Sequence, residues 1–178
     1  MQVCVCAAVR YGYVPMIQTI LIIFTVYQGC SPASGLTDEC NAIMDMADER
    51  LVSWIDWYWQ GELMNSWAPS EEGIATYSRT YAQSVAGFPT KMHFDANTKD
   101  FELCYNVNPS ITQPTEIYAN FAVHYPAGVS VAVSGSTIDM EVKVDAANNL
   151  IYVHYVGAVE TSQDNMDCCV SVSKNAKL

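Results

Sequence analysis

Residues 138–156 have the sequence IDMEVKVDAANNLIYVHYV, which decides the fold of the second half of the chain. Charged side chains alternate with apolar ones over residues 139–145, a pattern that predicts a strand with one solvent-exposed face and one buried face. The turn-forming residues Ala-Ala-Asn-Asn at 146–149 follow, and then the apolar run 150–156. This stretch is therefore expected to form an antiparallel β-hairpin.

Further short β-favouring segments lie on the N-terminal side of the hairpin, separated by turn residues. We expect them at residues 91–94, 101–106, 116–125 and 129–134. In the third segment, one face carries Ile117, Ala119, Phe121, Val123 and Tyr125. Together these segments predict an antiparallel β-sandwich over residues 88–178.

The preceding region, residues 30–87, has a different pattern. Thr37 and Asp38 can cap a helix over 38–52, whose apolar residues recur every three or four positions. The aromatic run 52–59, VSWIDWYW, is typical of a buried strand, and a second helix is expected over about 74–85. A helix that leads into a buried strand belongs to an α/β unit, but about 60 residues are far fewer than the ~250 of a βα barrel. We therefore interpret residues 30–87 as the last elements of a larger α/β unit.

Composition excludes several classes of function. The chain has 178 residues, 51% of them hydrophobic, with 8 Lys and Arg against 19 Asp and Glu, a net charge of −11. No basic cluster is present, so a nucleic-acid partner is not expected. The seven cysteines lack zinc-module spacing, and His93, His124 and His154 fall singly on predicted strands. We predict no metal site, no cofactor and no catalytic triad.

Residues 1–29 resemble a signal peptide, with Arg10 followed by the apolar run 17–26. This run is too short for a transmembrane span, which needs about 20 apolar residues. Export would make the protein secreted or lumenal and would favour disulfides, with Cys30–Cys40 as the favoured local pair. The alternatives are a buried strand or a segment foreign to the fold. Cys168 and Cys169 are interpreted as ordinary thiols, one of them open to bridging.

Six motifs, in this order, resemble the C-terminal part of endoglycoceramidases, which are glycoside hydrolases of family 5. They are ADERLVSW at 47–54, the aromatic run to Trp59-Gln60, SRTYAQSVAG at 78–87, Phe94-Asp95, PTEIY at 114–118 and YPAGV at 125–129. The resemblance covers about residues 30–160. It implies an α+β chain with the truncated, terminal βα elements of a TIM-type (β/α)8 barrel, followed by the antiparallel β-sandwich.

The family cleaves the linkage between an oligosaccharide and ceramide with retention, using two carboxyl groups about 5 Å apart. Its nucleophile is the Glu of a Thr-Glu-Phe-Gly motif, but the corresponding stretch here is TVYQG at 25–29, with Val26 at the nucleophile position. The strand that carries the acid/base Glu has no counterpart in this sequence. No catalytic residue is therefore assigned. Asp56 lies among Trp rings, but we interpret it as a solvated or hydrogen-bonded strand residue.

The resemblance places Trp57 and Trp59 where a sugar ring could stack on an aromatic face, so we predict that they bind substrate. Core packing remains the alternative for both, and it is the preferred interpretation for Trp54.

The sequence thus predicts the C-terminal portion of an endoglycoceramidase-like hydrolase, inactive as an isolated chain, with a glycosphingolipid or oligosaccharide as the substrate of the family. The alternative is a non-catalytic secreted β-sandwich that binds glycolipid or makes peripheral contact with a membrane surface.

Overall fold

The computed structural model describes residues 10–11, 37–54, 64–65, 68–69, 71–135, 139–157 and 166–175. The N-terminal part of this set contains two helices, α1 (Thr37–Glu49) and α2 (Glu71–Tyr77), and the small pair of strands β2 (Met64–Asn65) and β3 (Ala68–Pro69). The predicted helix at 38–52 is confirmed as α1. The acidic Asp38 and Glu39 in its first turn suit the positive end of the helix dipole.

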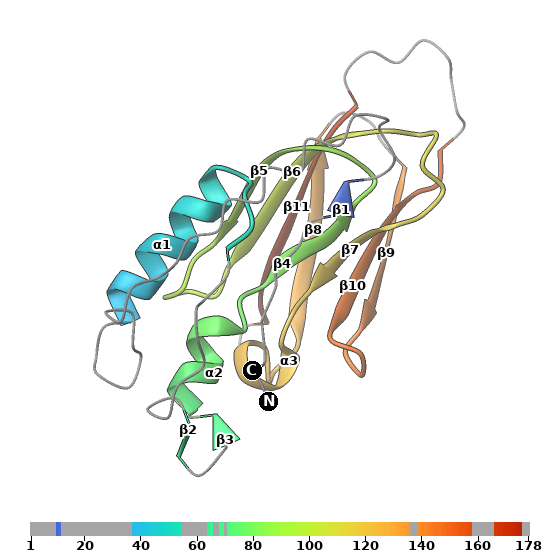
Figure 1. The fold of residues 1–178 in the computed structure, drawn as a ribbon. Helices are drawn as coiled ribbons and strands as arrows, with labels where there is room; N and C mark the ends of the chain where they lie inside the picture. The colour runs from blue at the N-terminus through green and yellow to red at the C-terminus, as the bar shows by residue number, and fades with distance from the viewer. Residues whose placement is uncertain are drawn as a thin grey trace.

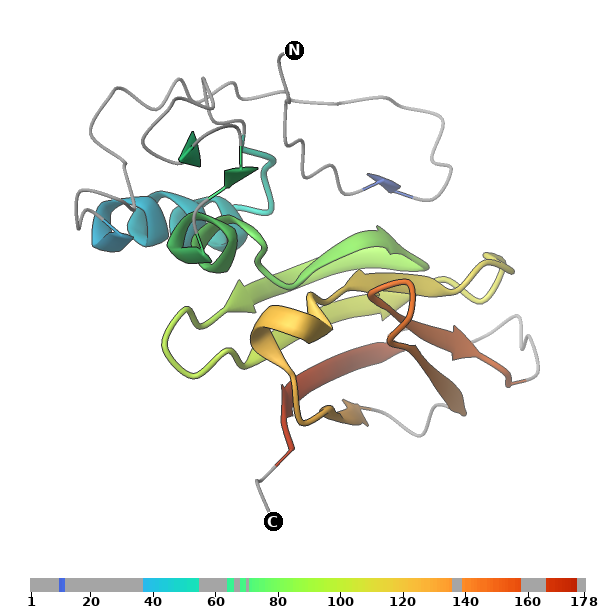
Figure 2. The same cartoon turned by 90° about the horizontal axis from the view of Figure 1, so that it is seen from below.

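The remaining strands form two sheets that face each other (Figures 1 and 2). The first sheet has the order β1 (Arg10–Tyr11), β4 (Tyr81–Val85), β7 (Thr115–Tyr118), β10 (Leu150–Tyr155), β9 (Met140–Asp145). The second has the order β5 (Gly87–Phe94), β6 (Phe101–Val107), β11 (Asp167–Lys174), β8 (Val129–Gly135). Every pairing is antiparallel except that of β1 with β4. The antiparallel β-sandwich is therefore confirmed.

One apolar core fills the space between the two sheets. Alternate residues of each strand point into it, as the pleat requires. Its most deeply buried large side chains are Phe94, Phe101, Leu103, Tyr105, Ile117, Tyr125, Ile151, Val153, Val170 and Val172. Both sheets contribute to this list, so the two sheets share one core.

The hairpin predicted from residues 138–156 is confirmed, since β9 and β10 pair with Asp145 opposite Leu150. The strand predicted over 116–125 is wrong in its second half: β7 ends at Tyr118, and a short helix, α3 (Phe121–His124), follows. Asn120 caps this helix by accepting a hydrogen bond from the Val123 N–H. The helix turns Val123 out to solvent, while Phe121 and Tyr125 remain buried.

The helix predicted over 74–85 is also wrong beyond α2. Residues 81–85 form β4, because Ala82 pairs with Ile117 of β7 and is fully buried there. A distant partner strand overrides a locally helix-compatible sequence. The division of the chain at residue 87 stays a prediction, and β4, which precedes it, lies in the first sheet.

The two edges of the sandwich differ. Helix α1 lies beside β5 and covers one edge (Figure 2). At the other edge the strands β8 and β9 end their sheets, and the inward-facing Val142 and Val144 are 37% and 44% exposed. The apolar face of residues 139–145, which we predicted to be buried, is therefore only partly buried. Each helix in the described ranges falls short of the length and apolarity that a membrane crossing requires.

Candidate functional site

The residues predicted to contact substrate, Trp57 and Trp59, lie outside the described residues, as do Asp56 and Cys30. The strand predicted for residues 52–59 therefore stays a prediction beyond residue 54. Cys40 is disulfide-bonded, but its pairing with Cys30 likewise stays a prediction.

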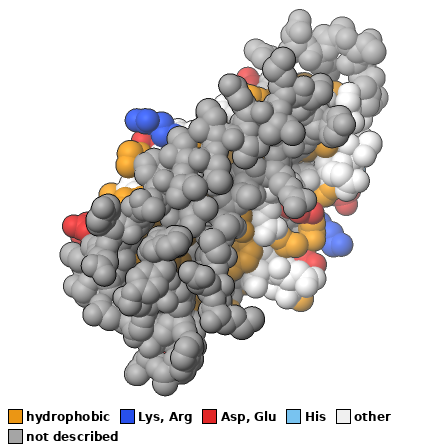
Figure 3. Space-filling view, viewed as in Figure 1, with side chains coloured by type: hydrophobic (Ala, Val, Ile, Leu, Met, Phe, Trp, Pro, Cys, Tyr) orange, Lys and Arg blue, Asp and Glu red, His pale blue; other side chains and the backbone are white. Residues whose placement is uncertain are grey.

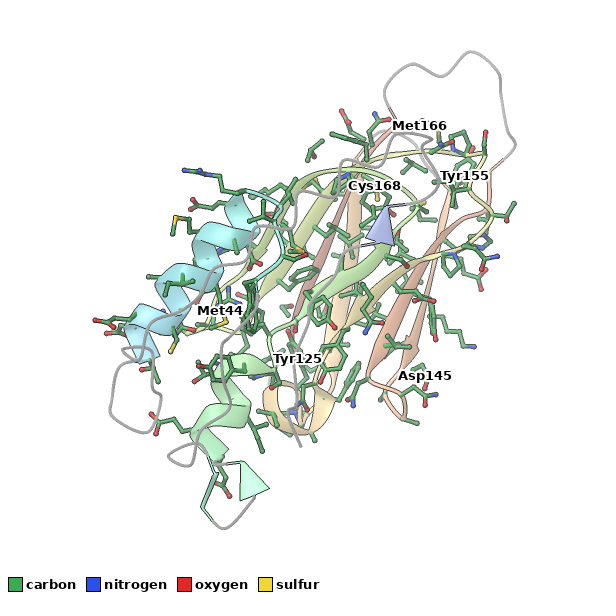
Figure 4. All side chains as sticks on the ribbon, in the orientation of Figure 1. Met44, Tyr125, Asp145, Tyr155, Met166 and Cys168 are labelled. Atoms are coloured by element: carbon green, nitrogen blue, oxygen red, sulfur yellow. A yellow bond between two sulfur atoms is a disulfide. The ribbon has the colours of Figure 1, made fainter. Side chains whose placement is uncertain are left out.

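A small apolar core lies between α1 and α2. It contains Cys40, Met44 and Ala47 from α1, together with Trp54 and Tyr77. Met44 extends from α1 toward the sandwich in Figure 4. Trp54 is 8% exposed, and its ring centre lies 6.0 Å from that of Tyr77. Core packing of Trp54 is therefore confirmed.

Arg79 connects α1 to the sandwich through its charged side chain. It follows α2, is only 4% exposed, and its Nη2 donates to Asp45 Oδ1 at 2.5 Å and to Asp48 Oδ2 at 3.0 Å. The same nitrogen donates to the backbone carbonyl of Phe94 at 2.9 Å, and the guanidinium lies over the Phe94 ring at 5.1 Å. One side chain thus joins α1 to β5.

The sequence spacing on α1 explains how this arrangement forms. Asn41, Asp45 and Asp48 are separated by four and three residues, so they lie on one face of the helix, and all three accept hydrogen bonds from Arg79. We did not single out Arg79 in the sequence beyond its place in a family motif. The sequence did contain a signal for this network: Asn41, Asp45 and Asp48 share one face of the predicted helix, and Arg79 follows later in the chain.

Asp45 and Asp48 do not meet the requirements of a glycosidase carboxyl pair. Retaining enzymes place two carboxyl groups about 5 Å apart with the sugar between them. Here the Arg79 guanidinium occupies that space, and Asp48 is buried. Burial raises the pKa of Asp48, although Arg79 opposes this shift. The pair neutralises a buried cation.

The same carboxylates, with His93, bring three possible metal ligands within 4.8 Å of one another. Both carboxylates already bind the guanidinium of Arg79, so a cation occupies the position that a metal would take. This cluster is a structural ion pair.

Ser78 Oγ lies 3.4 Å from His124 Nε2, but shorter hydrogen bonds to backbone carbonyls occupy the N–H of His124 and the hydroxyl of Ser78, so the two do not act as a nucleophile and its base. His124 Nε2 lies 3.0 Å from the Ser78 carbonyl oxygen and donates to it, because a carbonyl can only accept. Ser78 Oγ donates to the Ile74 carbonyl at 2.6 Å. Neither residue can therefore activate the other. His124, expected on a strand, lies in α3, and burial lowers its pKa to about 4.

Removing the Arg79 guanidinium should destabilise the fold strongly. Arg79→Met leaves Asp48 buried without its cation, so we expect the free energy of unfolding to fall by about 3 kcal/mol or more. Urea denaturation followed by circular dichroism measures this change. Arg50→Met, which removes an exposed arginine just after α1, is the matched control. Equal free energies of unfolding for the two variants would contradict the role of Arg79 as the cation that pairs with the buried Asp48.

His124 should make the stability depend on pH. Its folded pKa of about 4 lies below the ordinary 6.5, so the unfolded state binds the proton first. The contribution of neutral His124 to the free energy of unfolding is fully present above pH 6.5. Roughly 3 kcal/mol of that free energy is lost as the pH falls from 6.5 to 4. Unfolding free energies measured across this window should lose that slope in His124→Gln and keep it in the control His154→Gln. An unchanged slope in His124→Gln would show that another group is responsible.

Comparison with known proteins shows which family most of the sandwich is similar to. Residues 79–165 match the family model of the glycoside hydrolase family 5 C-terminal domain. Endoglycoceramidase I of Rhodococcus hoagii is 40% identical over 95 residues, which are 52% of this chain and 18% of that protein. The endoglycoceramidase of Hydra vulgaris is 34% identical over 97 residues, 48% of this chain and 19% of that protein. The chain thus spans about a fifth of the length of these relatives.

Solved structures show the same fold. Endo-glycoceramidase II from Rhodococcus sp. matches 80% of this chain and 30% of its own, with a TM-score of 0.56 and 25% identity. Sterylglucosidase 1 of Cryptococcus neoformans matches 80% of this chain and 25% of its own, with a TM-score of 0.62 but only 17% identity, and so supports the fold alone. Residues 79–165 are therefore similar to the glycoside hydrolase family 5 C-terminal domain, and this chain is similar to the C-terminal part of endoglycoceramidases.

Proposed function

We propose that this chain is the C-terminal portion of an endoglycoceramidase-like retaining glycoside hydrolase, which cleaves the oligosaccharide–ceramide linkage of glycosphingolipids. The observation that carries the proposal is the family match over residues 79–165, which includes the strands from β4 to β10. The 40% identity to a bacterial endoglycoceramidase supports this choice of substrate.

In this proposal, residues 30–87 are the last elements of a TIM-type barrel and residues 88–178 are the appended sandwich. The contact of α1 with β5 through Arg79 supports it, because a barrel helix must be held firmly to serve an active site. Trp57 and Trp59, at the end of the proposed eighth barrel strand, would stack on the sugar.

The isolated chain is proposed to be inactive. Val26 stands at the position of the nucleophile, and no counterpart of the acid/base Glu is recognised in the sequence. Among the described residues, Asp45 and Asp48 are committed to Arg79 and cannot replace that pair. Export through residues 1–29 is part of this proposal, since it would bring the chain to an extracellular or lumenal substrate.

A second candidate function is non-catalytic binding of glycolipid or of a membrane surface, and the uncovered sandwich edge favours it. Val142 and Val144 are inward-facing apolar side chains that remain exposed there. Hydrophobic, charged and other polar side chains are mixed on the side of the molecule where β9 and β10 lie (Figure 3). Such a mixed surface suits an interface with both apolar and polar parts.

One preparation of ganglioside-containing vesicles tests both functions. The proposed hydrolase portion should release no oligosaccharide by itself. A chimaera in which residues 79–165 replace the matched segment of the Rhodococcus hoagii enzyme should keep at least about a tenth of that enzyme's kcat/KM, a loss within about 1.4 kcal/mol. Liquid chromatography of the released sugar measures both.

Release by the isolated chain, or a folded but inactive chimaera, would contradict the proposal. The second candidate instead predicts co-sedimentation of the isolated chain with the vesicles. Val142→Ser with Val144→Ser should abolish it, and Phe88→Ser, which removes an exposed apolar side chain from β5, should not.

A further inference from the structure

The outer face of the second sheet carries a disulfide that the sequence analysis did not predict. Cys104 on β6 and Cys169 on β11 are bonded, although 65 residues separate them in the chain. They are directly opposite each other in the strand register. Their neighbours Leu103, Tyr105, Cys168 and Val170 are buried in the core, so the two bonded cysteines point away from it and are half-buried.

Glu102 lies beside this disulfide. It precedes Cys104 by two residues on β6, so both side chains project from the same face. Glu102 Oε1 is 3.9 Å from Cys104 Sγ, and Glu102 Oε2 forms an ion pair with Lys91 of β5. The carboxylate oxygen and the two sulfurs all lie within 4.8 Å of one another.

Reduction would turn these three groups into metal ligands. A dithiol reductant would supply two electrons and two protons: the Cys104–Cys169 bond breaks, two thiols form, and the reductant closes its own disulfide. Binding of a divalent cation would then release the two thiol protons and form two metal–sulfur bonds. Six residue pairs join β6 to β11, so the ladder keeps the two cysteines opposite each other when the bond is broken.

The chemistry of this set selects the ion. Two thiolates favour a borderline-soft cation, and zinc accepts sulfur and carboxylate oxygen together in a tetrahedral site. Three protein ligands leave the fourth position to water, and the half-exposed setting allows the ion to enter. We propose that Glu102, Cys104 and Cys169 form a redox-gated zinc site, closed by the disulfide and opened by dithiol reduction.

Cys168 provides an internal contrast. It is next to Cys169 in sequence but points into the core, where it is 1% exposed (Figure 4). Burial raises the pKa of its thiol. It therefore cannot join the site without a change of strand register.

The test uses the full chain, reduced with dithiothreitol, freed of reductant under anaerobic conditions and titrated with Cd²⁺. The sulfur-to-cadmium absorption in the ultraviolet reports thiolate ligands. Reduced wild type should bind one more equivalent than reduced Cys104→Ser/Cys169→Ser, because the other cysteines contribute equally to both. Zn²⁺ should compete for that equivalent, and the unreduced protein should not bind it.

Two further variants make the result decisive. Glu102→Gln, which keeps the disulfide during folding, should weaken the extra site at least about tenfold. Cys168→Ala should keep the extra site. Equal titrations of reduced wild type and the double Ser variant, or an unchanged affinity in Glu102→Gln, would overturn the proposal. If the double variant fails to fold, the Glu102→Gln titration decides alone.

Discussion

The buried guanidinium of Arg79 is the interaction on which the arrangement of helices and sheets depends. Burying a cation is costly unless opposite charges and hydrogen bonds surround it. Asp45 and Asp48 on α1 and the Phe94 carbonyl at the end of β5 meet that requirement from two different elements. Since the carboxylates cannot leave without exposing an unpaired charge to the core, α1 is fixed against the edge of the sandwich.

This constraint gives the sandwich two unlike edges. One is covered by α1, whereas β8 and β9 leave the other open, with apolar side chains that are only partly buried. The charged and polar groups brought together in the described residues stabilise the fold: Arg79 binds two carboxylates, and His124 donates to the Ser78 carbonyl. A domain built in this way suits the place proposed for it, in the C-terminal portion of a larger hydrolase.

Local patterns predicted the elements whose partners are close in sequence. The amphipathic spacing of α1 and the alternating charges of the β9–β10 hairpin are of this kind. Elements that depend on distant residues were not predictable. β4 needs β7 as a partner, and α3 begins at Phe121, whose N–H donates to Asn149 of the hairpin turn. The bonded Cys104 and Cys169 meet only because β11, which we did not predict, pairs with β6. For the same reason the Arg79 network required the folded chain.

The central claim is that α1 and the two sheets unfold as one cooperative unit. Native-state hydrogen exchange on the wild-type chain tests it most directly, because it gives an opening free energy for each amide. We predict that the amides of the buried residues Met44 and Asp48 in α1 exchange with the same opening free energy as those of Leu103 in β6 and Ile151 in β10. Exchange of the α1 amides with an opening free energy several kcal/mol lower than that of the strands would contradict the account.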